Sequence, residues 1–276
     1  MQKTKPFLKW AGGKFQIIDV LLKYFPTATR LIEPFTGSGA VFLNTNFSNY
    51  ILAEQNRDLI NLFLQLQKEG PQFINYCANF FVAANNCADK FYLFRQQFNQ
   101  CKHLKRRAGI FLYLNRHGFN GLCRYNQQGG YNVPFGRYVK PYFPRREMTL
   151  FHQKSHQAIF IPADFRQTFE LAQPGDIIYC DPPYVPLSST AYFNHYTPIK
   201  FTLKDHIDLS DLAFKSAKKG ITVIISNHDT PFTRHYYRHG QLISLTVRRS
   251  ISCHANKRYP APELLAIFND AVFPHL

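Results

Sequence analysis

Four consecutive residues, Asp181-Pro182-Pro183-Tyr184, combine a carboxylate, two imino acids and an aromatic ring directly after an apolar run that predicts a buried strand. An exocyclic amine on a heteroaromatic ring is a poor nucleophile because its lone pair is delocalised into the ring. Asp181 can accept one N–H bond of such an amine and a backbone carbonyl of the Pro-Pro segment the other, which returns electron density to nitrogen. The prolines keep the segment extended, and Tyr184 offers a face for stacking. The segment suits a protein that holds a flat ring while its amine attacks an electrophile, although a proline-rich loop after a core strand is the alternative.

A second group of residues suggests the electrophile. Trp10-Ala11-Gly12-Gly13-Lys14 places two glycines between the only tryptophan of the chain and a lysine. Glycine lets the backbone approach a ligand closely, Lys14 can meet a carboxylate, and Trp10 can face an apolar or cationic group. A ligand that carries both a carboxylate and a sulfonium fits these residues, which points to S-adenosylmethionine.

The glycine-rich turn Glu33-Pro34-Phe35-Thr36-Gly37-Ser38-Gly39 follows a predicted strand at 30–33, and a second predicted strand at 50–54 ends in Glu54. Strand, glycine loop, helix, strand and acid in this order are typical of a nucleotide-type βαβ unit, with the acid placed to meet ribose hydroxyls. The turn is too short for a phosphate-binding loop. Asp164 and Phe165 follow another predicted strand and could contact an adenine, but a plain loop is an equal alternative.

These segments lie on an α/β pattern that is interrupted in the middle of the chain. Strands are predicted at 30–33, 50–54, 158–161, 176–180, 221–226, 242–247 and 264–268. Residues 57–144 are mainly helical and include a hairpin, punctuated by glycine and proline, at about 118–139. We therefore predict a discontinuous Rossmann-like catalytic domain, residues 1–56 and 145–276, with a mixed, mostly parallel sheet. Residues 57–144 are predicted to form an inserted, mainly helical domain that carries this hairpin.

The charge distribution favours a polyanionic partner. Lys and Arg number 33 against 17 Asp and Glu, a formal charge of +16. No acidic residue occurs between Lys90 and Arg146, where basic residues alternate with tyrosine and phenylalanine. A solvated helical face would mix signs, so the stretch indicates a phosphate-binding surface, with nucleic acid ahead of a membrane. A generally basic protein is the alternative.

The rest of the composition narrows the class of protein. The chain has 276 residues and is 45% hydrophobic, enough for one large domain or two small ones with a sizeable core. No apolar run is long enough to cross a membrane and no signal peptide is evident. The six cysteines form no Cys-x-x-Cys pair and no histidine cluster accompanies them, so we expect reduced thiols, no metal and a cytoplasmic protein.

Taken together, the motifs resemble the DNA adenine methyltransferases of the Dam type, in the α group of amino-methyltransferases. The resemblance runs along nearly the whole chain. It rests on FLKWAGGK at 7–14, the Glu33–Gly39 turn, FLYLNR at 111–116, NGLCRYN at 120–126, NVPFGRY at 132–138, the Asp181–Tyr184 segment and SNHDT at 226–230.

The resemblance implies a site-specific enzyme that methylates the N6 amine of a flipped-out adenine in GATC, with S-adenosylmethionine as donor and double-stranded DNA as partner. Flipping is needed because the amine is paired and stacked inside the duplex. Asp181, Pro182, Pro183 and Tyr184 would grip the base. The candidate cofactor-binding set is Trp10, Gly12, Gly13, Lys14, Glu33, Pro34, Phe35, Gly37, Ser38, Gly39, Glu54, Asp164, Phe165 and Asp181.

The resemblance also places target recognition in residues 118–138. Arg124 would contact a guanine edge in bidentate fashion, which guanidinium geometry supports independently, and Leu122 and Pro134 would contact a thymine methyl group. Phe119 and Asn120 would fill the gap left by the flipped base. The remaining DNA-binding candidates are Lys9, which would touch the first guanine, Tyr138, and the phosphate-binding residues Arg95, Arg116, Asn126, Asn132 and Arg137.

Two positions depart from the family pattern. Phe119 replaces a common tyrosine, so stacking survives without a hydroxyl contact, and Glu54 replaces a common aspartate, which we expect to change affinity rather than chemistry. The basic loop at 248–258 could close over DNA or could be a solvated loop. Alternatives to the enzyme are a non-catalytic DNA-binding derivative, or methylation of a cytosine, an RNA base or a protein amide. We expect a monomer without an obligate protein partner, and a role in mismatch repair, replication timing, gene control or restriction protection stays open.

Overall fold

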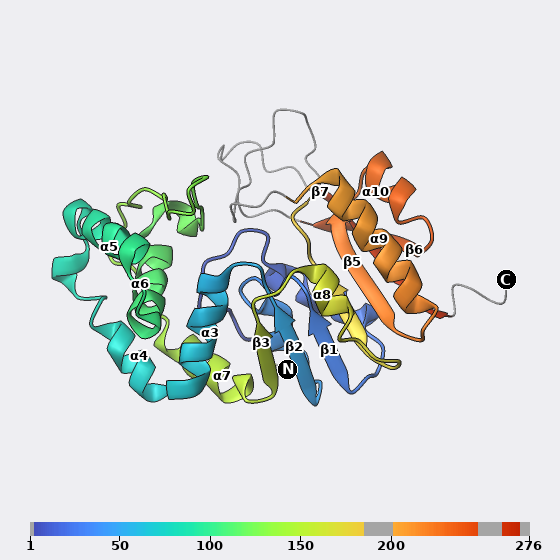
Figure 1. Ribbon diagram of the computed structural model, residues 1–276, viewed down its shortest axis with the longest axis horizontal. Coiled ribbons are helices and arrows are strands. Elements are labelled where there is room, and N and C mark those ends of the chain that lie inside the picture. Colours follow the sequence, from blue (N-terminus) through green and yellow to red (C-terminus); the bar gives the residue numbers. More distant parts are fainter. Residues whose placement is uncertain (1–2, 185–200, 248–260, 271–276) are drawn as a thin grey trace.

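A single seven-stranded sheet organises the computed structural model, which describes residues 3–184, 201–247 and 261–270 (Figure 1). The strand order is β3-β2-β1-β4-β5-β7-β6; β7 runs antiparallel to both of its neighbours, β5 and β6, and the other described pairs are parallel. The predicted Rossmann-like fold with a mixed, mostly parallel sheet is confirmed. The strands are β1 (Arg30–Glu33), β2 (Asn49–Ala53), β3 (Ala158–Ile161), β4 (Ile177–Cys180), β5 (Thr222–His228), β6 (Gln241–Val247) and β7 (Ala261–Phe268).

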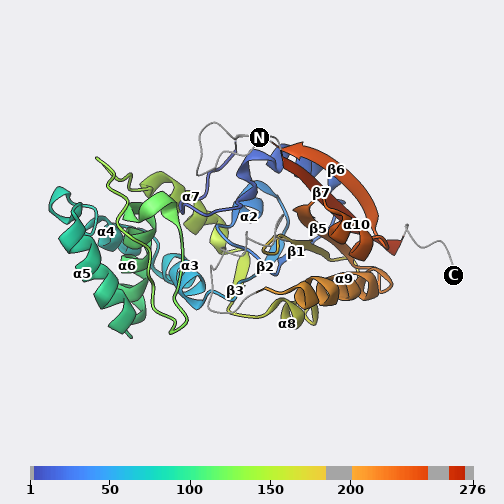
Figure 2. The same cartoon turned by 90° about the horizontal axis from the view of Figure 1, so that it is seen from above.

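Alternating side chains build two hydrophobic cores, one on each face of the sheet, because successive residues of a strand point to opposite faces. In β4, Ile177 and Tyr179 join one core, while Ile178 and Cys180 join the other. Helices α8 and α9 cover the second of these faces and α2 lies over the first (Figure 2). Both faces are covered, so the central strands read as continuous apolar runs rather than alternating ones.

The helices fall into two groups. Those of the sheet region are α1 (Ile18–Leu21), α2 (Ala40–Asn44), α7 (Arg145–Ser155), α8 (Phe165–Phe169), α9 (Leu203–Ala217) and α10 (Pro231–Tyr236), with 3-10 turns η1 (Lys14–Gln16) and η2 (Leu22–Tyr24). Those between β2 and β3 are α3 (Arg57–Glu69), α4 (Pro71–Ala78), α5 (Ala88–Gln100) and α6 (Leu104–His117), with η3 (Ala83–Asn85) and η4 (Phe119–Gly121). Helix α3 borders both groups, since it packs on α6 and on β3.

The segment predicted as a hairpin lies on the α5–α6 side of the molecule (Figure 1). It is held by two isolated antiparallel bridges, Gly118 to Phe135 and Tyr125 to Tyr131, rather than by two regular strands. Glycines and Pro134 interrupt the ladder, because proline lacks the N–H that a ladder needs. The segment keeps antiparallel pairing, as in the predicted hairpin, at these two points.

Asp58 links residues 118–139, the bridged segment, to helices α3 and α6. Asn56 caps α3 by accepting hydrogen bonds from the backbone N–H groups of Asp58 and Leu59. The Asp58 carboxylate accepts two hydrogen bonds from the Arg107 guanidinium on α6 and one from the Tyr125 hydroxyl at 2.8 Å. None of the helices in the described ranges has the length and apolar character to span a bilayer.

Candidate active site and nucleic-acid interface

The candidate site forms where the carboxyl ends of β1 and β4 lie side by side (Figure 1). From β1 the sheet continues through β2 and β3 in one direction and through β4 and β5 in the other. Open α/β sheets bind their ligands outside the carboxyl ends of the strands at such a switch point. Glu33 ends β1 and Asp181 follows β4, so the predicted cofactor and catalytic motifs meet at this edge.

Asp181 is held by groups from two other elements. Its Oδ1 lies 2.8 Å from Nζ of Lys14, which comes from η1, and accepts a hydrogen bond from the Ser226 hydroxyl on β5 at 3.3 Å. Burial raises the pKa of Asp181 and the charge of Lys14 opposes that rise. Lys14 is itself only 5% exposed. The ion pair therefore helps a buried carboxylate to stay ionised and able to accept hydrogen bonds.

Tyr184 is fixed at its ring and at its hydroxyl. Its ring packs edge-on against His228, with ring centroids 4.6 Å apart, and Nζ of Lys14 lies 4.6 Å from its centroid. The hydroxyl donates a hydrogen bond to Oε1 of Glu263. The structure thus brings Asp181, Tyr184 and Lys14 into one cluster.

The two glycine motifs fit around the tryptophan. Gly37 adopts a φ of +47°, and a Cβ there would lie 2.9 Å from Nε1 of Trp10, so a side chain at this position would displace the indole ring. Gly12 has a φ of +77°, and its carbonyl accepts a hydrogen bond from Nζ of Lys14 at 3.0 Å. The predicted motifs at 10–14 and 33–39 are therefore in contact.

One buried acid, Glu33, and one partly buried acid, Glu54, border these two glycine motifs. Glu54 accepts hydrogen bonds from the backbone N–H groups of Gly37 and Asn56, at 3.3 and 3.2 Å. Glu33 is 2% exposed, and burial raises its pKa to about 8. Among the described residues, Glu33 Oε1 and Thr36 Oγ1 have no hydrogen-bond partner. Buried polar atoms without partners are uncommon in proteins, and the ammonium and hydroxyl groups of S-adenosylmethionine are suitable partners, so the residues present fit this cofactor.

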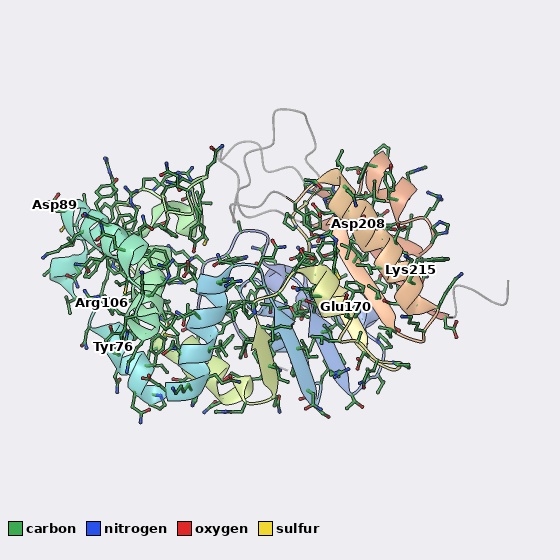
Figure 3. All side chains as sticks on the ribbon, viewed as in Figure 1. Tyr76, Asp89, Arg106, Glu170, Asp208 and Lys215 are labelled. Atoms are coloured by element: carbon green, nitrogen blue, oxygen red, sulfur yellow. The ribbon has the colours of Figure 1, made fainter. Side chains whose placement is uncertain are left out.

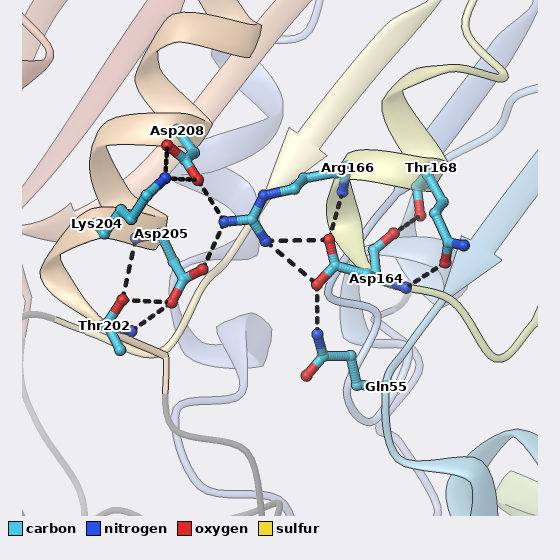
Figure 4. Close-up of polar contacts among 9 residues, drawn as sticks. Gln55, Asp164, Arg166, Thr168, Thr202, Lys204, Asp205 and Asp208 are labelled. Atoms are coloured by element: carbon cyan, nitrogen blue, oxygen red, sulfur yellow. Dashed lines mark hydrogen bonds and ion pairs between the residues drawn. The ribbon is translucent and has the colours of Figure 1, made fainter.

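Asp164 lies in a network of polar contacts at the start of α8 (Figure 4), and Phe165 follows it. Asp164 caps the helix by accepting from the backbone N–H of Arg166, and it accepts a hydrogen bond from Gln55 at 2.6 Å. The Arg166 side chain continues to two aspartates on α9, Asp205 and Asp208, at 2.6 Å each. Phe165 is buried and stacks on Phe35, with centroids 5.6 Å apart. A contact of these two residues with an adenine stays a prediction.

The predicted recognition residues differ in solvent exposure and in their hydrogen bonds within the protein. Phe119 is 48% exposed, and Asn120, which has a left-handed φ of +52°, is also exposed. Pro134 is also exposed, whereas Leu122 is partly buried. Arg124 is exposed, and its guanidinium donates to the side-chain and backbone oxygens of Asn132 at 2.8 and 3.2 Å. These residues lie together on the bridged segment.

Lys9 connects the cofactor motif to this segment. Its backbone exchanges hydrogen bonds with Asn115 on α6, and its Nζ lies 3.8 Å from the centroid of the Tyr138 ring. Burial lowers the pKa of Lys9 to about 8. A Cβ on Gly121 would overlap the Lys9 side chain. The chain at 7–14 therefore packs beneath the bridged segment at one end and against Asp181 at the other.

Several residues predicted to hold phosphates also organise the protein surface. Arg95 donates to the carbonyl of Val133, and Arg116 to that of Tyr142, both at 3.0 Å. The Asn126 side chain accepts from two backbone N–H groups of its own turn. Arg137 is exposed with a φ of +53°. Their phosphate contacts stay predictions.

Glu263 and Ser226 were missed by sequence reasoning. Ser226 belongs to a motif that carried the resemblance, but no role was assigned to it. Glu263 had one available signal, an acidic residue at the start of the apolar strand segment Leu264–Phe268. The basic loop at 248–258 lies outside the described residues. The cysteines described, Cys77, Cys87, Cys101, Cys123 and Cys180, are free thiols, and the ranges described contain no cluster of three or more metal-ligating side chains.

Comparison with known proteins gives a consistent result. The family model for D12 class N6 adenine-specific DNA methyltransferases matches residues 10–251. A DNA adenine methylase of Vibrio cholerae is 48% identical over 277 residues, covering 100% of this chain and 99% of the relative. DNA adenine methylases of Escherichia coli K12 and Serratia marcescens are 45% and 46% identical, covering 99% and 97% of this chain and 98% and 100% of those relatives.

Proposed function

The chain belongs to the D12 class of N6 adenine-specific DNA methyltransferases, and from that premise we propose that it methylates adenine N6 within GATC in double-stranded DNA. The methyl donor in this proposal is S-adenosylmethionine. The observation that carries the proposal is the buried cluster at the carboxyl ends of β1 and β4. There Asp181 is paired with Lys14 beside the ring of Tyr184.

Asp181 has the properties of an acceptor for the adenine amine. An accepted N–H bond keeps electron density on the amine nitrogen, and the acceptor must be ionised to do this well. Lys14 and Ser226 stabilise that ionised form. Tyr184 supplies the stacking face, and the fixed backbone of Pro182 and Pro183 offers a carbonyl for the second N–H bond. Holding the acceptor in place contributes to rate because the reacting groups need no further ordering.

The cofactor would be held by residues from both glycine motifs. Trp10 and Lys14 suit the sulfonium and carboxylate ends, Glu33 suits the ammonium group, and Glu54 suits ribose hydroxyls. When bound, S-adenosylmethionine supplies a methyl group already activated by the positive sulfur. The chain's residues then need only to orient the partners and exclude water.

The exposed residues of the bridged segment support a DNA duplex as substrate. Arg124 has the donor fork that matches a guanine edge, and Pro134 presents an apolar surface for a thymine methyl group. Phe119 and Asn120 are exposed beside them and can occupy the space of a displaced base. Lys9 links this surface to the site of chemistry through the backbone at 7–14.

A transfer assay tests the proposal directly. Purified protein is incubated with S-adenosylmethionine labelled in its methyl group and with two duplexes of equal composition, only one of which contains GATC. We expect label in the GATC duplex alone, on adenine N6. No transfer to either duplex would refute the enzyme, whereas equal transfer to both would refute only the GATC assignment.

A further inference from the structure

Glu263 is a buried acid at the active site that belongs to none of the predicted motifs. It lies near the amino end of β7, where it is in register with His228 of β5. Because β7 runs antiparallel to β5, the amino end of β7 lies beside the carboxyl ends of the parallel strands (Figure 1). The reversed strand is thus what brings a carboxylate from the end of the chain to the edge where Asp181 lies.

The carboxylate of Glu263 contacts two members of the cluster. Its Oε1 accepts the hydrogen bond from the Tyr184 hydroxyl and lies 3.5 Å from Nζ of Lys14. Glu263 is 8% exposed. Lys14 therefore lies between two carboxylates, with Asp181 the nearer one at 2.8 Å.

We propose that Glu263 is a positioning residue that holds the Tyr184 ring ready for the target base and shares the charge of Lys14 with Asp181. This inference rests on the function proposed above, in which Tyr184 stacks on the flipped-out adenine. A tyrosine free to rotate would have to be ordered each time the base enters, which costs free energy at that step. A tyrosine already anchored by its hydroxyl avoids this cost.

The choice of a carboxylate has a second consequence. A lysine paired with Asp181 alone would direct its full charge at the oxygen that has to accept an amine N–H bond. Glu263 draws part of that charge away, so Asp181 stays a better acceptor. Glutamine at this position would keep an acceptor for the tyrosine hydroxyl but would lose the charge.

A double-mutant cycle between Glu263 and Tyr184 tests the inference. Glu263→Ala, Glu263→Gln, Tyr184→Phe and the double variant Glu263→Ala with Tyr184→Phe are assayed for kcat and for KM with a GATC duplex. Base flipping is followed by fluorescence of 2-aminopurine at the target position. Glu170→Ala is the matched control, because Glu170 is an exposed acid at the end of α8, on another element (Figure 3).

We expect Glu263→Ala and Tyr184→Phe each to lower kcat about tenfold, the typical effect of losing a hydrogen bond to a charged group. KM for the duplex should change by less than about twofold, since uniform binding is not affected. The double variant should be no slower than Glu263→Ala, because the hydroxyl contact that Tyr184→Phe removes is already lost in Glu263→Ala. Glu263→Gln should lie between Glu263→Ala and wild type, and the 2-aminopurine signal should fall in step with kcat.

Multiplying losses in the double variant, or a change in KM alone, would overturn the inference. So would a kcat of Glu263→Ala equal to that of the Glu170→Ala control. Wild-type protein that transfers no methyl group would instead refute the proposed function, and this result is seen without any variant. Should Glu263→Ala fold poorly, Glu263→Met has a similar side-chain volume, removes the acceptor for the Tyr184 hydroxyl and carries the same cycle with Tyr184→Phe.

Discussion

The active-site cluster and the bridged recognition segment use charge in opposite ways. In the cluster, Lys14 lies within ion-pair distance of both Asp181 and Glu263, and all three side chains are largely shielded from solvent. In the segment, arginines such as Arg124 donate to neutral amide and carbonyl oxygens and remain exposed. In the first region the one positive charge faces two carboxylates, whereas in the second the positive charge of the arginines has no carboxylate partner among these contacts.

This difference separates two physical tasks. The charge of Lys14 opposes the rise that burial causes in the pKa of Asp181, so the cluster is suited to holding this carboxylate ionised for chemistry. Exposed arginines without carboxylate partners keep their charge available, so the segment is suited to binding a polyanion in a salt-dependent way. Changes in the cluster should therefore alter rate, and changes in the segment should alter binding and selectivity.

The largest effect should come from removing the acceptor itself. Asp181→Ala takes away the carboxylate that accepts the amine N–H bond, and we expect methyl transfer to fall about a thousandfold. Binding to a GATC duplex should stay within about twofold of wild type, because the exposed arginines are untouched. Transfer rates check the predicted loss of activity, and fluorescence anisotropy with a labelled duplex checks that binding is unchanged. Retained transfer would refute the role of Asp181, and lost binding would show that the two regions are not separable.

A buried acid of the cluster should destabilise the protein at high pH. Burial raises the pKa of Glu33 to about 8, above its value in the unfolded chain. The stability this group contributes is full below the unfolded pKa and is lost as pH rises through 8. Glu33→Gln should therefore be more stable than wild type at pH 9, by about 3 kcal/mol. The difference should shrink toward pH 6.

Urea unfolding at the two pH values measures this difference. Glu170→Gln is the control, since its carboxyl is exposed and should cause no such pH-dependent gap. A Glu33→Gln protein less stable than wild type at pH 9 would mean that Glu33 is ionised and paired in the free protein. Glu33 would then resemble Asp181, an ionised carboxylate with a charged partner, rather than a buried carboxyl group without one.

Replacing an acid by its amide at Asp58, next to the bridged segment, should lower the free energy of unfolding rather than raise it. Asp58 accepts hydrogen bonds from the guanidinium of Arg107 and the hydroxyl of Tyr125. Asp58→Asn leaves a partly buried guanidinium without its counter-charge, and we expect a loss of about 2 kcal/mol in unfolding free energy. Asp89→Asn, at an exposed aspartate in the first turn of α5 (Figure 3), should cost far less. Equal losses would show that Asp58 is not a tie between helices and segment.

The fold could be predicted from the sequence because its strands are apolar on both faces and because glycine and proline residues mark the turns between them. It also predicted which motifs meet, since Glu33 and Asp181 both follow strands and parallel strands end at one edge. Glu263 could not be found this way, because its place depends on β7 running antiparallel and on its register with His228. The segment predicted as a hairpin pairs antiparallel at two isolated bridges rather than in two regular strands, a detail that the glycine and proline spacing does not specify. The hydrogen bonds that Asp164 accepts could not be predicted, because packing decides that Arg166 and Gln55 are its partners.

The smallest effect separates arginines within the basic region. Arg124→Ala should reduce discrimination between GATC and a duplex altered at one guanine by about tenfold, since one bidentate base contact is worth about 1–3 kcal/mol. Arg106→Ala is the matched control: Arg106 is exposed on α6 and its guanidinium donates to Gln97 at 2.9 Å (Figure 3). It should weaken binding to both duplexes equally, if at all, because a phosphate contact carries no sequence information. Methyl-transfer rates measured with the two duplexes at one salt concentration give the ratio of GATC to altered-duplex activity. An unchanged ratio in Arg124→Ala would assign guanine recognition to another residue, whereas a changed ratio in Arg106→Ala would mean that base reading extends beyond the bridged segment.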